Sequence, residues 1–389
     1  MSGNPIWGDD WDDVRRLWLL DPEVAHCNHG SFGAVPGPVL EVQDGFRRRM
    51  AANPMRWFHR EMPGLVTEAR GEVARFLGAD PEALAFVSNV SAGVSVVAQS
   101  LPLRPGDQVL STNHIYGFVS LALDRLCART GAVRVVADIP VDSTDEKIAA
   151  IVEMNCSERT GLVVIDQVTS ATARRFPIEA VARIAHRVGA AVLVDGAHAP
   201  GMLPVDVPAI GADFWVGNLH KWPCAPAGTG VLWAAQEWRG QLLPLVVSAN
   251  ELEGFPSAFD RVGTNDLSAW LAAPSALHLL GSLGWDRVRN HNETLVRWAQ
   301  RRVAEILEIP AEELRHDPGL SLAVVPLPAG LADTRDQTHK LADHLAGLGV
   351  ETSMPVWSGR GTIRLSAHVY NEPADYERMA FGIRDFMSR

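Results

Sequence analysis

A single lysine, Lys221, lies in the segment GNLHKWPCAPAGTGVLW, between His220 and Trp222 and next to two prolines. These neighbours indicate a tight and buried turn, and burial lowers the pKa of an amine because it disfavours the charged form. A lysine with a lowered pKa is a usable nucleophile and proton carrier. The alternative is a surface lysine that extends its amine into water, and the local sequence does not exclude it.

Asp195 ends the apolar run AAVLVD and is followed by His198 in DGAHAPG. A carboxylate at the end of such an apolar strand needs a cation or several hydrogen-bond donors, because burying it unpaired is prohibitive. Lys221 follows a neighbouring apolar run and is the candidate partner.

Two further polar features follow apolar runs. Ser91, Ala92 and Gly93 open a helical pattern after LAFVSN, and the free N–H groups at a helix start form a phosphate site. An ordinary helix cap is the alternative. His114 follows DQVLSTN, where it could equally be a polar surface group or a hydrogen-bonded histidine.

A lysine, an aspartate, a phosphate site and a histidine at strand ends suit pyridoxal phosphate. The lysine amine would form a Schiff base with the cofactor, and the carboxylate would keep the pyridine nitrogen protonated. If Lys221 and Asp195 were not adjacent in space, the chain could instead be an α/β binding module without catalysis.

The elements that position these residues alternate between strands and helices. Unbroken apolar strands between amphipathic helices such as IEAVARIAHRVG predict a mainly parallel sheet, covered on both faces, over roughly residues 70–270. Ligands bind beyond the carboxyl ends of such strands, where the residues above lie. The expected strands are LAFVSN, DQVLSTN, VRVVADI, GLVVIDQV, AAVLVDGA, DFWVGN and GVLWAA.

A mainly helical stretch follows, and we expect interruptions at Pro274 and Gly284. The strand candidates LSLAVVPL and TIRLSAH come after it, around another helix. This pattern predicts a smaller α/β domain at the C-terminus.

Composition limits the class of protein. A chain of 389 residues, 47% of them hydrophobic, can bury a large core, and this length predicts two domains. The net charge of -11 is spread without a basic stripe, which favours a small-molecule partner over nucleic acid. The four cysteines lack a zinc-type spacing, so we expect reduced thiols and no metal site. We see no signal-peptide pattern and no apolar run of membrane-spanning length, and expect a soluble, cytoplasmic protein.

Seven motifs together resemble the class V aminotransferase family of fold-type I pyridoxal-phosphate enzymes, and its isopenicillin N epimerase-like branch in particular. They occur in the family order along nearly the whole chain: CNHGSFGAVP, NPMRWFHREMPG, QVTSAT, DGAHAPG, GNLHKW, RVGTND and IRLSAHVYN. The resemblance implies pyridoxal 5'-phosphate as cofactor and a homodimer. It also implies an N-terminal segment over residues 1–30 that contributes to the active site and the small domain, a large cofactor-binding domain over 31–270, and a small C-terminal domain over 271–389.

The resemblance also implies roles for individual residues. Lys221 would be the Schiff-base lysine, Asp195 the partner of the pyridinium and His114 the residue stacked on the ring, and these are the three expected catalytic residues. Arg364 would hold the substrate α-carboxylate, unless it pairs with an acidic neighbour such as Glu372. The remaining roles are ring-hydroxyl contacts for His198 and Ser170, substrate contact for Asn28, and phosphate contacts for Ser91, Ala92, Gly93, Asn218, His220 and, from the second subunit, Thr264.

Departures from the family pattern bear on the reaction. Cysteine desulfurases of the family need a catalytic cysteine in the loop before the carboxylate-binding arginine, and here the loop SMPVWSGRGTIRLS has no thiol. Gln167, Ile115 and Ala227 stand where relatives often carry other residues, so we expect a different substrate fit. We therefore expect chemistry at the α-carbon of an amino acid or amino-acid-containing small molecule. An epimerase or racemase is the first expectation, with a carbon–sulfur β-lyase or an aminotransferase as alternatives.

Overall fold

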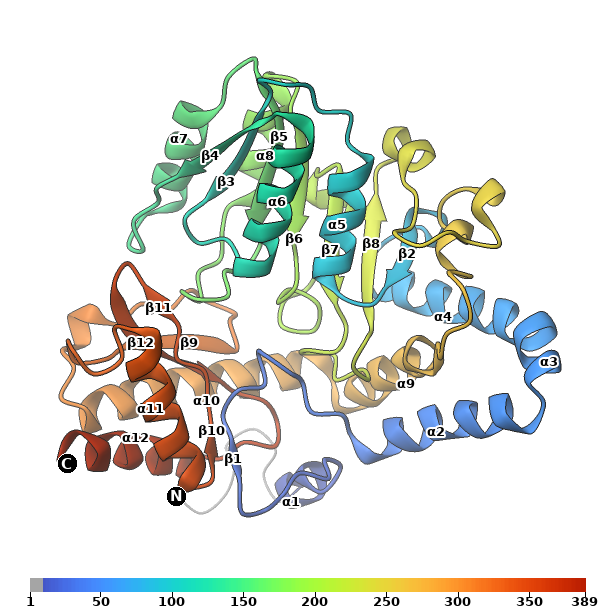
Figure 1. Ribbon diagram of the computed structural model, residues 1–389. Coiled ribbons are helices and arrows are strands. Elements are labelled where there is room, and N and C mark those ends of the chain that lie inside the picture. The colour runs from blue at the N-terminus through green and yellow to red at the C-terminus, as the bar shows by residue number, and fades with distance from the viewer. Residues whose placement is uncertain (1–9) are drawn as a thin grey trace.

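The computed structural model describes residues 10–389, so residues 1–9 of the expected N-terminal segment lie outside the described residues. A seven-stranded sheet of order β2-β8-β7-β6-β5-β3-β4 forms the centre of the large domain (Figure 1). Only β8 runs antiparallel to its neighbours in this sheet, which confirms the expected, mainly parallel arrangement. The strands are β2 (Leu84–Val87), β3 (Gln108–Thr112), β4 (Val133–Ala137), β5 (Thr160–Asp166), β6 (Ala191–Asp195), β7 (Phe214–Asn218) and β8 (Gly230–Ala234).

Helices cover both faces of this sheet. Successive residues of a strand point to opposite faces, and in β6 Leu193 joins one hydrophobic cluster while Val192 and Val194 join the other. This double burial explains why the strands read as unbroken apolar runs. One face carries α5 (Val90–Ser100) and α6 (Gly117–Thr130), and the other carries α4 (Met62–Phe76), α7 (Asp145–Asn155), α8 (Ile178–Arg187) and α9 (Ser268–Leu283).

Helix α9 contains Pro274 in its interior, so the expected interruption there is wrong. A proline removes one backbone donor, and the burial of α9 against α2 (Gly37–Ala52) and α4 outweighs that loss. The helix ends before Gly284, which has a φ of 89°. Because α9 packs into the large domain, the core of that domain extends beyond residue 270, and we propose Gly284 as the boundary.

The small domain has an antiparallel sheet of order β11-β12-β9. Helices α10, α11 and α12 contribute to the hydrophobic cluster that this sheet joins. The short strand β1 pairs in parallel with β10, which attaches the N-terminal segment to this domain. The elements are α1 (Trp11–Arg15), β1 (Ala25–His26), α10 (Trp285–Ile306), β9 (Leu322–Pro326), α11 (Arg335–Gly347), β10 (Val350–Glu351), β11 (Val356–Trp357), β12 (Arg360–Ser366) and α12 (Pro373–Met387).

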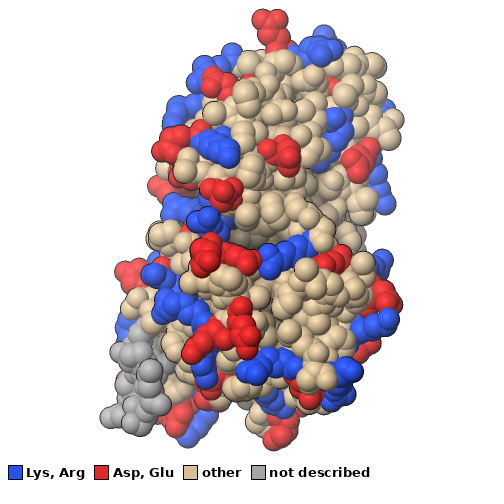
Figure 2. Space-filling view, turned by 90° about the vertical axis from the view of Figure 1, so that its left-hand side faces the viewer, with Lys and Arg blue, Asp and Glu red and all other residues tan. Residues whose placement is uncertain are grey.

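Short helical turns complete the described chain: α3 (Pro54–Arg56), a π-helical turn η1 (Trp57–Glu61), and the 3-10 turns η2 (Pro81–Ala83), η3 (Pro208–Ile210), η4 (Gln236–Gln241), η5 (Glu251–Glu253), η6 (Ser257–Phe259) and η7 (Ala311–Glu313). All four cysteines are free thiols. Within residues 10–389, every helix is too short or too polar to cross a membrane. Figure 2 shows acidic and basic side chains interspersed on one face and a recess between its upper and lower halves.

Candidate active site

Lys221 follows β7 and extends a half-buried side chain toward the loop after β6. Its Nζ lies 3.0 Å from Nε2 of His198. Burial and, to a smaller extent, the charge of Arg364 together lower the pKa of Lys221 to about 7, while Asp195 and Asp166 act in the opposite direction. The amine is therefore available in its neutral, nucleophilic form near neutral pH.

Two buried carboxyl groups lie beside each other near this lysine. Asp166 and Asp195 occupy paired positions at the ends of β5 and β6. Burial raises the pKa of both, but at Asp195 the N–H of Ala197 and the charge of Lys221 counteract this effect. At Asp166, burial and then the negative charge of the neighbouring Asp195 both raise the pKa, which lies well above the usual range of an aspartate. The pair therefore holds its proton on Asp166 and its charge on Asp195.

Asp195 and Lys221 face the same site without a direct contact. Among residues 10–389 no ion pair joins them, although the charge of Asp195 raises the pKa of Lys221. A pyridine ring bound between them would meet the amine at its aldehyde carbon and the carboxylate at its nitrogen. His198 lies beside the amine, and its buried Nδ1 has no partner in the described chain.

The start of α5 forms the expected phosphate end of the site. Asn89 caps the helix by accepting from the N–H of Ala92, and Asn218 accepts from the N–H of Val90. The structure thus shows the ordinary helix cap, and phosphate binding at the N–H and hydroxyl of Ser91 stays a prediction. Gly93 has a packing role, because a Cβ there would lie 2.7 Å from Cγ1 of Val216 on β7.

The other expected phosphate contacts are placed differently. His220 directs Nδ1 at the carbonyl of Thr229, 3.1 Å away, and burial lowers its pKa to about 4. Thr264 is exposed. Its role across a subunit interface stays a prediction.

His114 is buried at the end of β3, with both ring nitrogens in use. Its Nε2 donates to the carbonyl of Ile139 at 2.8 Å, and its Nδ1 accepts from the hydroxyl of Thr172 at 2.7 Å. The ring of Trp357 lies 5.0 Å away between centroids. His114 thus contributes ring surface rather than a free proton-transfer group, and its stacking on a cofactor stays a prediction.

Arg364 on β12 brings a buried guanidinium to the site from the small domain. Nη1 donates to the carbonyl and hydroxyl of Ser170, at 3.0 and 2.9 Å, and Nη2 donates to Oδ1 of Asn28 and Oγ of Ser31, at 3.0 and 2.6 Å. All four acceptors are neutral, and Nε has no partner in the described chain. A buried cation without an anionic partner is a binding site for a carboxylate.

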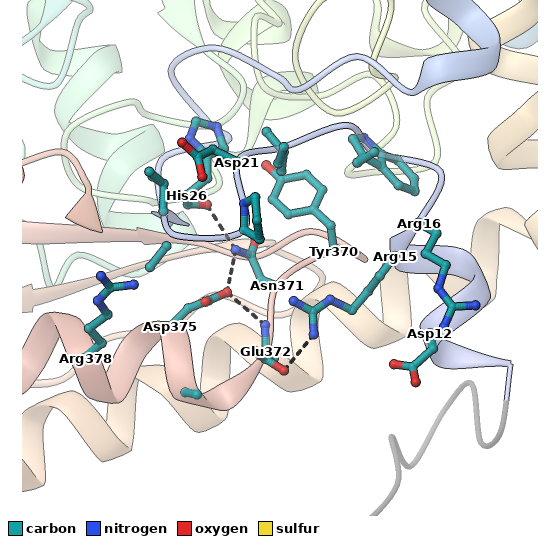
Figure 3. Close-up of a pocket in the computed structure, with 16 residues that line it drawn as sticks. Asp12, Arg15, Arg16, Asp21, His26, Tyr370, Asn371, Glu372, Asp375 and Arg378 are labelled. Atoms are coloured by element: carbon teal, nitrogen blue, oxygen red, sulfur yellow. Dashed lines mark hydrogen bonds and ion pairs between the residues drawn. The ribbon is translucent and has the colours of Figure 1, made fainter. Parts of the chain in front are cut away.

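The alternative role of Arg364, an ion pair with Glu372, is wrong. Glu372 pairs with Arg15 at 2.7 Å, at the edge of a separate cavity of about 500 Å³ between the N-terminal segment and the start of α12 (Figure 3). The residues that line this cavity include neither Lys221 nor Arg364. Glu372 therefore does not neutralise Arg364, and substrate binding by Arg364 stays a prediction.

The sequence analysis did not identify two residues of the site, Asp166 and Tyr116. Asp166 ends an apolar strand in GLVVIDQV, as Asp195 does in AAVLVDGA, so the same argument applied to both strands would have identified it. Tyr116 begins α6 and lies near Asp195 and Arg364; burial and then the charge of Asp195 raise its pKa. No sequence motif marked Tyr116.

The comparisons with known proteins agree with this geometry. The family model for aminotransferase class-V matches residues 33–379. An isopenicillin N epimerase of Amycolatopsis lactamdurans is 34% identical and the match covers 96% of this chain and 98% of that protein. A probable chloroplastic L-cysteine desulfhydrase of Arabidopsis thaliana is 30% identical over 92% of this chain and 82% of its own length.

Among solved structures, the apo cysteine desulfurase of Thermococcus onnurineus NA1 superposes with a TM-score of 0.82 at 24% identity, covering 97% of this chain and 98% of that chain. At this identity the likeness shows the fold, which is fold-type I. The lysine, the carboxylate and the helix start fit the three ends of pyridoxal 5'-phosphate, which is the cofactor. The chain belongs to the class V aminotransferase family of pyridoxal-phosphate enzymes.

Proposed function

We propose that the protein is an epimerase or racemase acting at the α-carbon of an amino acid or of a small molecule that contains one. The observation that carries this proposal is Arg364, a buried guanidinium held only by neutral acceptors on the small-domain side of the site. A carboxylate bound there would place the α-carbon between Arg364 and Lys221.

Three residues of the chain have separate roles in this reaction. The bound cofactor supplies an electron sink for the α-carbon. Arg364 orients the substrate through its carboxylate, and Lys221 takes the α-proton because its amine is neutral near pH 7. Asp195 keeps the negative charge that holds a proton on the pyridine nitrogen, since its neighbour Asp166 carries the shared proton.

Two features bear on the choice among the possible reactions. The hairpin of β11 and β12 before Arg364 has no thiol and turns at Ser358 and Gly359, with φ of 50° and 77°, so persulfide formation by a cysteine of that loop is not available. The relative named isopenicillin N epimerase covers nearly the whole chain.

A carbon–sulfur β-lyase is the second candidate, favoured by the relative named L-cysteine desulfhydrase. An aminotransferase shares the same first proton transfer. Incubation of the holoenzyme with a panel of amino acids in heavy water separates the three. Deuterium at the α-carbon with both configurations recovered supports the epimerase. Release of a keto acid with ammonia supports the lyase, and a keto acid with an aminated cofactor supports the aminotransferase.

We also propose a cytosolic homodimer. The segment that leads to Thr264 exposes Leu245, Val247 and Leu252, and exposed apolar side chains gathered on one segment indicate a protein–protein contact. We propose that a second copy of this chain packs against this segment, so that Thr264 of each copy lies near the active site of the other.

A further inference from the structure

The peptide segment around Lys221 is held by residues of the N-terminal loop over residues 28–33 and of the small domain. The carbonyls of three successive residues each accept one hydrogen bond from such a residue. Gly33 N–H donates to His220 at 3.1 Å, Nε2 of His29 donates to Lys221 at 3.0 Å, and Nε2 of His368 donates to Trp222 at 3.3 Å.

The two imidazoles form one buried unit. The rings of His29 and His368 stack with centroids 4.2 Å apart and planes inclined by 19°. Because a carbonyl only accepts, each Nε2 must carry the hydrogen, and Nδ1 of His29 accepts from the hydroxyl of Tyr370 at 2.8 Å. Cys224 lies beside both rings, but the hydrogens on Nε2 assign the cluster to hydrogen bonding rather than to a metal ion.

The same N-terminal loop also holds Arg364. Asn28 and Ser31 accept hydrogen bonds from its Nη2, on either side of His29. Gly33 completes the loop, and a Cβ there would lie 2.4 Å from the carbonyl oxygen of Lys221, so only glycine allows this close approach. Residues 28–33 thus contact the carboxylate-binding arginine and the lysine segment at once.

Substrate binding must disturb this loop. A guanidinium has five N–H donors, and the four on Nη1 and Nη2 of Arg364 are taken by Ser170, Asn28 and Ser31, which leaves Nε alone. A carboxylate that binds through two parallel hydrogen bonds takes one Nη2 hydrogen together with either the Nε hydrogen or one Nη1 hydrogen. One of the two loop acceptors must therefore leave Arg364.

We infer that residues 28–33 couple the arrival of a carboxylate at Arg364 to the position of Lys221, with His29 and His368 as positioning residues. This inference rests on the proposed function, because it takes Arg364 as the carboxylate site. When Asn28 or Ser31 no longer accepts a hydrogen bond from Arg364, the loop moves and its hydrogen bonds to the carbonyls of His220 and Lys221 break. The amine is then free to move from its resting place beside His198 as the substrate binds.

Backbone hydrogen exchange in the holoenzyme tests the coupling. The probe is propionate, which has a carboxylate but no amine and cannot replace the lysine. Saturating propionate is expected to speed exchange about fivefold or more at Gly33, which bonds to His220, and at Cys224, whose N–H donates to the Lys221 carbonyl at 2.9 Å. If propionate speeds hydrogen exchange at Gly33 but leaves the exchange rate at Cys224 unchanged, the coupling is overturned, while Arg364 remains the carboxylate site.

Variants of His29 and His368 show which contacts carry the response. His29→Leu and His368→Leu should lose most of the response at Cys224, whereas His29→Gln and His368→Gln, which keep an N–H donor, should retain it. His344→Leu is the matched control, because His344 also lies 3.1 Å from a small-domain carbonyl, that of Gly382, but away from the lysine. An equal response in the wild type and both Leu variants would overturn the inference.

Two further outcomes are decisive. If propionate changes neither the visible absorption nor the melting temperature of the holoenzyme, Arg364 is not a carboxylate site, and the proposed function and the coupling both fail. Stoichiometric metal in the purified holoenzyme that disappears in His368→Gln would make the cluster a metal site and would contradict the positioning role.

Discussion

Asp166 lies directly beside Asp195 in the register of β5 and β6, and both carboxyl groups are buried. Two like charges in such a place do not coexist, so one group holds a proton. The N–H of Ala197 and the charge of Lys221 oppose the rise in the pKa of Asp195, whereas burial and the charge of Asp195 hold the pKa of Asp166 well above its usual range, which assigns the proton to Asp166. The two aspartates therefore differ in function although the sequence presents them alike.

Substitution of each aspartate by asparagine should have opposite consequences. Asp195→Asn should keep the cofactor bound but lower kcat by about a hundredfold or more, because a neutral amide cannot hold the pyridine nitrogen protonated. Asp166→Asn should stay near the wild-type rate, because an amide resembles the protonated carboxyl group that is already there. Parallel measurements of kcat and cofactor content test this; equal losses in the two variants would reject the assignment.

Lys221 should set the pH dependence of cofactor capture. With its pKa lowered to about 7, the neutral amine increases as the pH rises through 7. The rate at which apoenzyme binds pyridoxal phosphate covalently should rise about tenfold between pH 6 and pH 8 and then level off. An ordinary lysine would continue to gain reactivity up to about pH 10, so a rate still climbing there would contradict the lowered pKa.

Removal of the positive charge of Arg364 provides a control for the pH dependence of cofactor capture by Lys221. The charge of Arg364 lowers the pKa of Lys221, so Arg364→Gln should move the midpoint of cofactor capture to higher pH. A midpoint that stays at the wild-type value would show that burial alone sets the pKa.

Arg364→Lys should weaken amino-acid binding selectively. A lysine cannot reproduce the two parallel hydrogen bonds of a guanidinium, and loss of such a buried pair costs roughly 2 to 5 kcal/mol, or about 30-fold to several-thousand-fold in kcat/KM. The melting temperature of the holoenzyme should also fall, because a lysine cannot make all four hydrogen bonds that Arg364 donates, so the deciding readout is the selective loss of amino-acid binding. Decarboxylated amines are the control ligands. If the wild type binds them as tightly as the amino acids, the carboxylate role fails.

The fold was largely readable from the sequence because each central strand is buried on both faces. The runs LAFVSN and DFWVGN became β2 and β7 with only their polar ends left out. Helix α9 was misjudged at Pro274 because its burial between α2 and α4 depends on residues distant in sequence. Packing of that kind leaves no local signal.

Only part of the site could be predicted from the sequence. Lys221 and Asp195 stood out because charged residues end apolar strands. Arg364 came from the family resemblance alone, since nothing near it in the sequence marks a buried, unpaired guanidinium. The contact of His29 with the carbonyl of Lys221 joins residues far apart in the chain, and backbone carbonyls have no sequence signature. Such contacts required the structure.

Thr264 should act through a second subunit. If it completes a phosphate site across an interface, cofactor loss and dimer dissociation should promote each other, and Thr264→Val should weaken both cofactor retention and dimerisation. Sedimentation of holoenzyme and apoenzyme at several concentrations measures this linkage. A fully active monomer would disprove the shared site.

The covalent attachment site of the cofactor tests the account most directly. The chain has only three lysines, Lys147, Lys221 and Lys340. Lys147 is exposed on α7, and Lys340 is exposed and paired with Asp336 at 2.6 Å, so Lys221 alone has the environment that makes an amine reactive. Borohydride reduction of the holoenzyme followed by peptide mass mapping should place the pyridoxyl group on Lys221, and Lys221→Ala should lose both the label and turnover, while Lys340→Ala keeps both. A label on Lys147 or Lys340, or normal turnover in Lys221→Ala, would contradict the central claim.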